Sequence, residues 1–456
     1  MGNTGAKHGH PKLRPMIYDI NAGDTAWVLI SAALVLLMTP GLAFFYGGMV
    51  RAKGVLNMLM MSFVTMGTVG VLWVLYGYSM AFGNSVGGLV GNPLEFAGLA
   101  GLMSEDAVVG TVPTLAFVGF QACFAIIAVA LVSGAIADRA TFAGWVVFTV
   151  LWATLVYFPA AHWVFAFDGT TAEFGGFIAN SIQAIDFAGG TAIHINAGAA
   201  ALALCLVIGP RLGFGRTPMR PHNLTLVMLG AGLLWFGWFG FNAGSALGAN
   251  ATAGVAWINT LGATAAAMLG WLLVERLRDG HATSLGAASG IVAGLVGITP
   301  AANSVSPLGG LIIGLLAGVC CSFAIGLKNR LGYDDSLDVV GVHLVGGLVG
   351  TLLIGFLADP STPAGVPGLF YGGGFDQLGR QVLGAAVVMV YSFVVTFVIA
   401  KVLDMTMGLR VKEAAESQGI DVAEHAETGY DLSHVGYSTY GVRQTLIVPA
   451  REEASR

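Results

Sequence analysis

Eleven separate runs of apolar residues, each about as long as a bilayer is thick, constrain this chain more than any other feature of its sequence. A hydrocarbon core of about 30 Å needs roughly 20 helical residues at a rise of about 1.5 Å per residue. Runs of that length, separated by charged or Pro-, Gly- and Asn-rich breaks, occupy residues 26–48, 55–80, 113–137, 142–166, 187–209, 224–247, 252–274, 281–299, 308–327, 337–357 and 381–403. We therefore predict an all-α membrane protein with eleven transmembrane helices.

The overall composition excludes a soluble fold. Hydrophobic residues make up 56% of the 456-residue chain and charged residues 10%, whereas soluble proteins carry about 45–50% and about 25% respectively. So few charges cannot cover the surface of a water-soluble protein of this size. No charge run indicates nucleic-acid binding, and residues 1–25 lack the apolar core of a cleavable signal peptide. The first apolar run is therefore expected to remain as a span.

The positions of lysine and arginine predict the orientation of the chain, because cytoplasmic loops carry an excess of these residues. With the N-terminus placed outside, the outward loops between spans contain one basic residue, Arg380. The inward loops contain ten basic residues. These ten are Arg51, Lys53, Arg139, Arg211, Arg216, Arg220, Arg276, Arg278, Lys328 and Arg330. We predict that the N-terminus lies outside and the C-terminus inside, which requires an odd number of spans.

The spans divide the chain into three segments. We expect residues 1–25 to form an extracellular N-terminal segment, residues 26–403 to form the membrane domain, and residues 404–456 to form a cytoplasmic tail. The tail is charged and has no apolar run able to cross a bilayer. It is either a solvated chain end, which is the commoner case, or a segment that binds a partner.

Two histidines lie deep inside apolar spans, and their surroundings mirror each other. His194 follows Asp186 by eight residues, which places it about 12 Å along a helix that enters from outside. His343 follows Asp338 by five residues, about 8 Å along a helix that enters from inside. Antiparallel spans that each have an Asp at the start and a His within are typical of two five-span halves in inverted repeat, followed here by one final helix. Such halves place a site between them near the bilayer centre.

An ionisable residue inside a span is costly and indicates function by default. A single buried histidine is more often a core residue that is hydrogen-bonded to a neighbouring helix, but two at matching depth favour a shared pore site. Asp186 has two interpretations: it caps the first amides of its helix, and it places negative potential near an external vestibule for cations.

A metal site and a bound cofactor are not predicted. No Cys, Asp or Glu joins the two histidines at comparable depth. The cysteines lie in apolar runs without C-x-x-C spacing, which indicates small buried residues and not a disulfide framework. They are Cys123, Cys205, Cys320 and Cys321. No nucleophile–base pair appears either, so an enzyme is the weakest functional class.

Aromatic residues add a second layer to the predicted pore. They occur at Phe120 and Phe124 in the third span, at Trp163 and Phe165 in the fourth, and at Trp238 and Phe241 in the sixth. Each alone is more typical of packing or of contact with lipid. Together they have the chemistry of an aromatic cage for a small cation, or of stacked rings that close an apolar gate.

At these residues the sequence resembles the ammonium transporter (Amt/Mep/Rh) family, in particular its bacterial Amt branch. The resemblance covers nearly the whole chain and includes GLAFFYGGMVRAKGVLNM (41–58), DFAGGTAIHINAGAAALALCLVIGPR (186–211), WFGFNAGSA (238–246) and DVVGVHLVGG (338–347). It implies a homotrimer in the plasma (inner) membrane with one pore per subunit. The tail at 408–430 resembles the cytoplasmic segment through which such transporters meet PII signal proteins.

The resemblance also implies roles for individual residues. His194 and His343 would be the twin pore histidines, and Asp186 would support ammonium recruitment. Phe124 and Phe241 would form the stacked gate. Ser245, with Phe124 and Phe165, would recruit ammonium at the external cation site.

Phe165 departs from the family pattern, which often has tryptophan at this position. A phenyl ring lacks the indole N–H and is a weaker cation–π partner, which puts the affinity of recruitment in question. Trp163, two residues earlier, would point elsewhere on a helix and is not expected to substitute.

The resulting expectation is a channel-like transporter for ammonium. A cation crosses a narrow apolar pore only at high cost, and ammonium avoids that cost by giving up its proton, which potassium cannot do. The vestibule would bind the cation, ammonia would pass, and the imidazole pair would hydrogen-bond it and relay the proton. The alternative from another class is an ammonium sensor or receptor that signals through its tail.

The charge bias generates a topological prediction. Cysteines introduced near Val90 and Ala364 should react with an impermeant thiol reagent from outside, and one near Thr217 should not, because only the last lies in a loop on the positively charged side. Labelling in sealed, right-side-out vesicles checks this. Reaction at Thr217 in intact vesicles would overturn the orientation.

Overall fold

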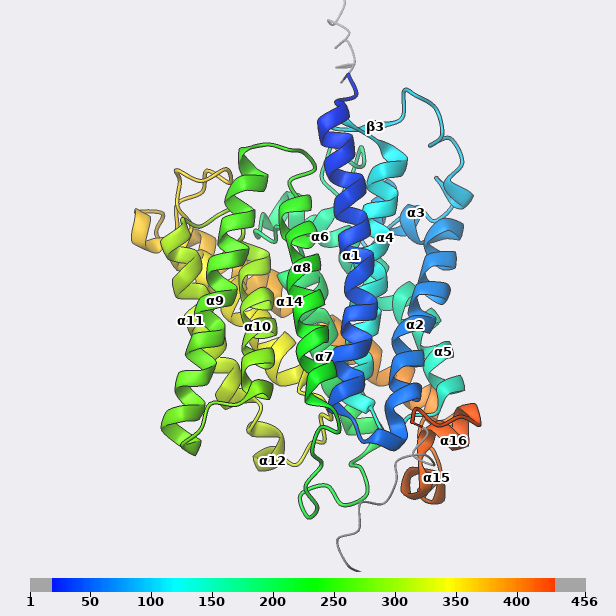
Figure 1. The fold of residues 1–456 in the computed structure, drawn as a ribbon. Coiled ribbons are helices and arrows are strands. Elements are labelled where there is room, and N and C mark those ends of the chain that lie inside the picture. The colour runs from blue at the N-terminus through cyan, green and yellow to red at the C-terminus, as the bar shows by residue number, and fades with distance from the viewer. Residues whose placement is uncertain (1–18, 431–456) are drawn as a thin grey trace, which may run out of the picture.

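A computed structural model describes residues 19–430, and eleven helices in this part of the chain are long and apolar enough to cross a membrane. They stand side by side as a bundle (Figure 1). The helices that make these spans are α1 (Ala22–Met49), α2 continuing into α3 (Val55–Leu72 and Tyr78–Phe82), α4 (Thr114–Val132), α5 continuing into α6 (Phe142–Trp152 and Phe158–Phe165), α7 (Asn196–Ile208), α8 (Leu224–Gly244), α9 (Ala251–Asp279), α10 (Ser284–Ile298), α11 (Pro307–Ala324), α13 (Val345–Leu357) and α14 (Asp376–Thr406). The prediction of eleven transmembrane helices is confirmed.

The remaining elements are short and lie at the ends of the bundle. Two hairpins, β1–β2 (Ser85–Val86 and Val90–Gly91) and β3–β4 (Val108–Val109 and Val112–Pro113), lie in the connection between α3 and α4. Helix α12 (Leu327–Leu331) extends the ninth span. Helices α15 (Glu413–Gln418) and α16 (Ile420–His425) belong to the tail and lie at the opposite end of the bundle from the start of α1 (Figure 1). An odd number of spans produces this placement.

The predicted boundaries differ from the helices mainly at their ends. The sixth and seventh spans are separate, because Asn250 caps the start of α9 by accepting from the Ala253 N–H. Helix α1 begins at Ala22, inside the segment assigned to 1–25, where Asn21 accepts from the Asp24 N–H. Helix α14 runs from Asp376 to Thr406, beyond the apolar run 381–403 at both ends. Apolar runs mark the hydrocarbon core, whereas helices continue into the polar layers. Residues 1–18 and 431–456 lie outside the described part of the chain.

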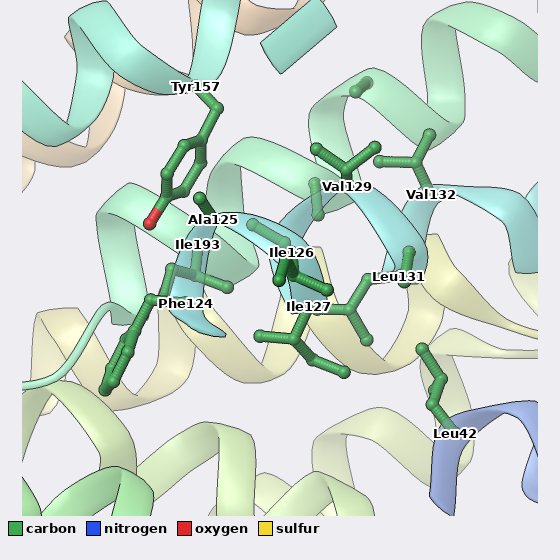
Figure 2. Close-up of a cluster of buried hydrophobic side chains, with 14 of the residues drawn as sticks. Leu42, Phe124, Ala125, Ile126, Ile127, Val129, Leu131, Val132, Tyr157 and Ile193 are labelled. Atoms are coloured by element: carbon green, nitrogen blue, oxygen red, sulfur yellow. The ribbon is translucent and has the colours of Figure 1, made fainter. Parts of the chain in front are cut away.

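Helix α4 passes through the centre of the bundle. Every residue from Cys123 to Val132 is buried, and this part of the helix is apolar on all sides, as expected for a helix surrounded by protein. Figure 2 shows its side chains together with Leu42 of α1, Tyr157 from the π-helical turn between α5 and α6, and Ile193. The position of α4 brings Phe124 into the interior of the molecule.

Small residues allow helices to approach until their backbones touch. Gly310, Gly314 and Gly318 recur every four residues along α11 and face α9. A Cβ atom at Gly314 would overlap the carbonyl oxygen of Ala263, and one at Gly318 would overlap that of Ala267. Stripes of small residues are the usual means of close packing in membranes, where van der Waals contact replaces the hydrophobic effect between helices.

Gly314→Ala should therefore destabilise the protein, since overpacking costs about 1–3 kcal/mol. We expect the apparent Tm of the purified protein in detergent to fall by several degrees. The matched control is Gly67→Ala in α2, where an added Cβ meets no atom within 4 Å, and alanine favours the helix by about 1 kcal/mol. Equal Tm values for the two variants would contradict the proposed backbone contact.

Candidate functional site

The two buried histidines lie in matching elements that enter the bundle from opposite ends. His194 is part of the π-helical turn Gly190–Ile195, which leads into the 13 residues of α7. His343 is part of the π-helical turn Val340–Leu344, which leads into the 13 residues of α13. Single π-helical turns within α-helices are frequent at functional sites. The matching order of turn and helix agrees with the inverted repeat that the sequence predicts.

The imidazole rings of His194 and His343 are in direct contact. Their Nδ1 atoms lie 3.2 Å apart, and the ring centroids are 5.3 Å apart with an interplanar angle of 23°. Both side chains are buried, at 1% and 3% exposure. Because a hydrogen bond between two Nδ1 atoms needs one donor and one acceptor, the pair holds one proton between its rings. The Nε2 atom of His194 is buried without a hydrogen-bond partner among the described residues.

Asp186 positions the turn that carries His194. Its carboxylate accepts from the N–H groups of Gly189 (2.9 Å) and Gly190 (2.6 Å) at Oδ1, and from those of Thr191 (2.8 Å) and Ala192 (3.0 Å) at Oδ2. The first N–H groups of a helix have no partner within the helix, and here one side chain satisfies them inside the bundle. All the lone pairs that face the turn are occupied. Both oxygens of Asp186 are therefore committed to the backbone of this turn.

At the second half-helix, the turn that carries His343, the carboxylate that accepts from the first N–H groups is that of Asp335. Asp338 directly precedes the turn with His343, but its Oδ1 atom pairs with Lys328 Nζ at 2.6 Å. Asp335 accepts instead from the N–H groups of Val339 (3.1 Å) and Val340 (2.7 Å). Burial raises the pKa of Asp335 above its ordinary value, and its backbone hydrogen bonds oppose that shift.

Two buried arginines hold the segment that leads into the second half-helix. Arg211 makes a bidentate contact with Asp334, with Nε–Oδ2 at 2.9 Å and Nη2–Oδ1 at 2.8 Å. Arg139, at 0% exposure, donates to the carbonyl oxygen of Asp334 and to the hydroxyl of Ser336. Burial opposes ionisation of Asp334, but hydrogen bonds from Arg211 hold the pKa of this carboxyl below its ordinary value. The cytoplasmic loop is thus fixed by paired charges.

Two stacked phenyl rings cover the outer side of the histidines. The rings of Phe124 and Phe241 have centroids 4.3 Å apart and an interplanar angle of 24°, and both are fully buried. Phe241 and Trp238 lie 6.1 Å and 5.4 Å from the His194 ring. The indole of Trp238 donates to Thr299 Oγ1 at 2.8 Å, which fixes its orientation. The stack separates the histidines from the outer end of the protein with apolar atoms.

A cavity of about 90 Å³, which we call the aromatic cavity, lies against Phe124 of the stack. Phe124, Phe165 and Ser245, the residues expected at the external cation site, all line it. The hydroxyl of Ser245 donates to the Phe241 carbonyl oxygen at 2.8 Å, which leaves its oxygen lone pairs available to a ligand. Trp163 lies elsewhere, since its indole donates to the Leu89 carbonyl oxygen and its ring packs against Tyr391.

A wider vestibule of about 590 Å³ adjoins the aromatic cavity. Asp186 lines the vestibule and not the aromatic cavity. Four residues line both spaces and connect them: Phe165, Phe167, Phe187 and Ser245. Sequence reasoning missed Phe167 and Phe187, although each is within two residues of a predicted site residue. Their positions depend on how the loops fold over the cavity, which periodicity does not encode.

Little open space lies on the cytoplasmic side of the two histidines. A cavity of only about 10 Å³ adjoins His343 and is lined by residues including Tyr46, Met49 and Asp338. Within residues 19–430, no group of three or more His, Cys, Asp or Glu side chains is placed to hold a metal ion.

The tail packs against the cytoplasmic ends of the spans. It pairs with the loop before α5, where the Val411 N–H donates to the Arg139 carbonyl oxygen and the Thr141 N–H donates to that of Leu409, both at 2.9 Å. Helix α16 follows and lies against α2 (Figure 1). The described tail is therefore an ordered part of the protein.

Three carboxylates of the tail accept hydrogen bonds from backbone N–H groups of the membrane domain. Asp421 accepts from Leu56 (3.1 Å) and Asn57 (2.8 Å) at the start of α2. Glu424 accepts from Phe142 (2.8 Å) at the start of α5. Glu416 accepts from the Leu212 N–H at 2.6 Å. The contacts of Asp421 and Glu424 complete helix starts that otherwise lack partners for their N–H groups, whereas Glu416 holds the loop after α7.

Comparison with known proteins gives a consistent result. The family described as the Ammonium Transporter Family matches residues 26–430. Ammonium transporters of Mycobacterium tuberculosis and Corynebacterium glutamicum are 62% and 46% identical over 453 and 420 residues. The first match covers 95% of each chain and the second 91% of each.

Solved structures agree with the sequence comparison. The structure of Candida albicans Mep2 superposes with a TM-score of 0.81 at 32% identity and covers 94% of this chain and 95% of that one. A chain described as a sensor Amt protein gives a TM-score of 0.81 at 29% identity, covering 88% and 98%.

Proposed function

The chain belongs to the ammonium transporter family and is a multi-pass ammonium transporter of the plasma membrane, and from this premise we propose a mechanism of ammonium recruitment, deprotonation and ammonia conduction past a twin-histidine pore. The observation that carries the proposal is the contact between His194 and His343 directly beneath two stacked phenyl rings. This arrangement combines a barrier to bare cations with groups that accept and donate protons.

Recruitment takes place in the aromatic cavity. The rings of Phe124 and Phe165 offer negative faces to a cation, and the Ser245 hydroxyl offers an oxygen lone pair to an ammonium N–H. Asp186 adds negative potential from the neighbouring vestibule while its oxygens hold the first turn of the half-helix. The absence of an indole at position 165 makes this a site of modest affinity.

Ammonium must lose its proton because the stacked rings that lie next on its path exclude water. An ion that enters the stack of Phe124 and Phe241 loses its water and gains no charged partner, which is costly in an apolar environment. Neutral ammonia carries no such cost. Potassium has no proton to release, so the stack discriminates between the two cations.

The histidine pair receives ammonia and relays the proton. The free Nε2 atom of His194 faces an apolar environment, and its protonation state is linked to that of His343 through the shared Nδ1 hydrogen bond. In the relay, the proton given up by ammonium is taken up at Nε2 of His194, the proton shared between the two Nδ1 atoms shifts to His343, and His343 releases a proton from its own Nε2 toward the small cavity that it borders. Because the two rings exchange protons in concert, neither histidine has to remain positively charged by itself in the apolar interior.

The assembly and the regulation of the transporter are part of the same proposal. The proposed assembly is the homotrimer with one pore per subunit that membership of this family implies. The carboxylate contacts between the tail and the starts of α2 and α5 support a regulatory tail at which a PII signal protein binds. A sensor that reports occupancy through the tail is the alternative, and a related fold is described as a sensor Amt protein. Uptake measurements separate the two.

Replacing either histidine tests the relay. His194→Ala and His343→Ala should each lower ammonium uptake into proteoliposomes at least about tenfold, and the double variant should fall no further, because coupled residues act as a unit. His194→Glu should retain conduction but lose discrimination against potassium, since a fixed carboxylate stabilises a dehydrated cation.

The matched control is His162→Ala, because His162 is a fully buried histidine that lines none of these spaces and bonds to the Ala81 carbonyl oxygen. Thermal stability and membrane insertion are measured for every variant. Correctly inserted alanine variants that carry ammonium with wild-type rate and selectivity would make the pair structural.

Removal of the tail tests regulation. Deletion from Gly408 should change transport activity or PII-protein binding while membrane insertion is retained, because the spans are complete at Thr406. Asp421→Ala should expose the tail to limited proteolysis, since loss of a helix cap costs about 1 kcal/mol. Glu427→Ala, an exposed acid of the same segment, is the control. A truncated protein identical to wild type in transport and in partner pull-down would reduce the tail to a solvated end.

A further inference from the structure

Phe167 is a large exposed aromatic residue at the boundary between the vestibule and the aromatic cavity. Its side chain is 48% exposed, whereas Phe165, two residues earlier, is 9% exposed. Both rings line both spaces. Phe167 is therefore the most open phenyl ring on the route by which a cation enters.

The ring of Phe167 is not part of the packed core of the bundle. Within residues 19–430, Phe167 is absent from both buried hydrophobic clusters and from the apolar side chains packed against them, whereas Phe187 packs against both. Exposing an aromatic ring to water without a packing partner is unfavourable. A role in binding explains its position better than a role in stability.

The backbone around Phe167 is held by several hydrogen bonds. We call residues 166–176 the mouth loop. The Phe167 N–H donates to Thr171 Oγ1 at 2.9 Å, and its carbonyl oxygen accepts from the Thr171 N–H at 3.1 Å. Asp168 accepts from the Gly175 N–H at 2.6 Å, and its own N–H donates to Asn180 Oδ1 at 3.0 Å. The ring is thus presented by a preorganised loop.

We propose that Phe167 is a specificity-determining residue of the external cation site, where its ring forms the outer wall of the aromatic cavity and adds a cation–π face opposite the buried rings. This inference rests on the proposed recruitment of ammonium in that cavity. A cation entering from the vestibule meets Phe167 before it reaches Phe124, so Phe167 affects capture and not the steps at the histidines.

The size of the cavity explains the discrimination. About 90 Å³ holds an ammonium ion with few waters. With the ring in place, the cavity is bounded on its outer side, and the added methyl group of methylammonium competes for that space. Removing the ring opens the cavity to the vestibule. The affinity for ammonium then falls, and the preference for ammonium over methylammonium decreases.

Substitutions of Phe167 distinguish a contribution of its aromatic ring to cation binding from a contribution of its size alone. Phe167→Leu keeps an apolar side chain without a ring, and Phe167→Trp supplies a stronger cation–π partner. The matched control is Phe174→Leu, because Phe174 belongs to the same mouth loop, is 64% exposed, and is not among the residues that line either space. Full-length protein in proteoliposomes is assayed for the KM and Vmax of ammonium and methylammonium.

We expect Phe167→Leu to raise the KM for ammonium about two- to fivefold, the effect of one exposed cation–π contact, with little change in Vmax. The ratio of the KM for methylammonium to that for ammonium should fall. Phe167→Trp should bring the KM for ammonium to the wild-type value or below it, and Phe174→Leu should match the wild type.

His194→Ala in the same vesicles separates this inference from the relay. If His194→Ala loses transport while Phe167→Leu and Phe167→Trp keep both wild-type KM values, the inference about Phe167 is overturned and the relay stands. If His194→Ala transports normally while Phe167→Leu raises the KM for ammonium, the relay is overturned and the inference stands. An equal rise in KM for Phe167→Leu and Phe174→Leu would indicate a general disturbance of the mouth loop, and would also overturn the assignment.

Discussion

A helix that starts inside an apolar bundle has backbone N–H groups that water cannot reach, and the arrangement of this transporter depends on how those groups are satisfied. Asp186 bonds to four of them with its two oxygens, and Asp335 does the same for two at the other half-helix. With the amides satisfied, each half-helix can begin within the protein and carry a histidine in its first turn. The meeting of His194 and His343 is a consequence of these two caps.

The polar and charged groups of the proposed path lie at its outer end, and the stacked rings and histidines lie near the centre of the protein. In the proposed mechanism, the charge, hydroxyl and aromatic groups of the outer part bind a cation, and the stacked rings and imidazoles of the inner part exclude one. These demands conflict within a single site, because a strong cation site would also retain its ligand. Their separation by the Phe124–Phe241 stack allows binding and conduction to be set by different side chains.

Much of the fold followed from the sequence because hydrophobicity and charge act locally. Eleven apolar runs gave eleven helices, and the short interval 247–251 proved to be a true break. The facing of His194 and His343 also followed, from their depth in antiparallel spans. The cap of the second half-helix did not follow from the sequence, which shows only that Asp338 stands near its start. Asp335 accepts from the first N–H groups, while Asp338 pairs with Lys328, and both contacts depend on how the loop folds. Phe167 was missed for a related reason: its loop has no periodicity, and hydrogen bonds distant in sequence, such as that to Asn180, determine where the ring lies.

The carboxylates that complete the inner ends of α2 and α5 come from residues 421 and 424, far along the chain from the helices they cap. Chains are synthesised from the N-terminus, so these two helices enter the membrane long before their caps exist. During that interval their first amides depend on the cytoplasm for hydrogen bonds. Docking of the tail completes the capping of both helices, and only a chain whose synthesis has passed residue 424 can supply these two caps.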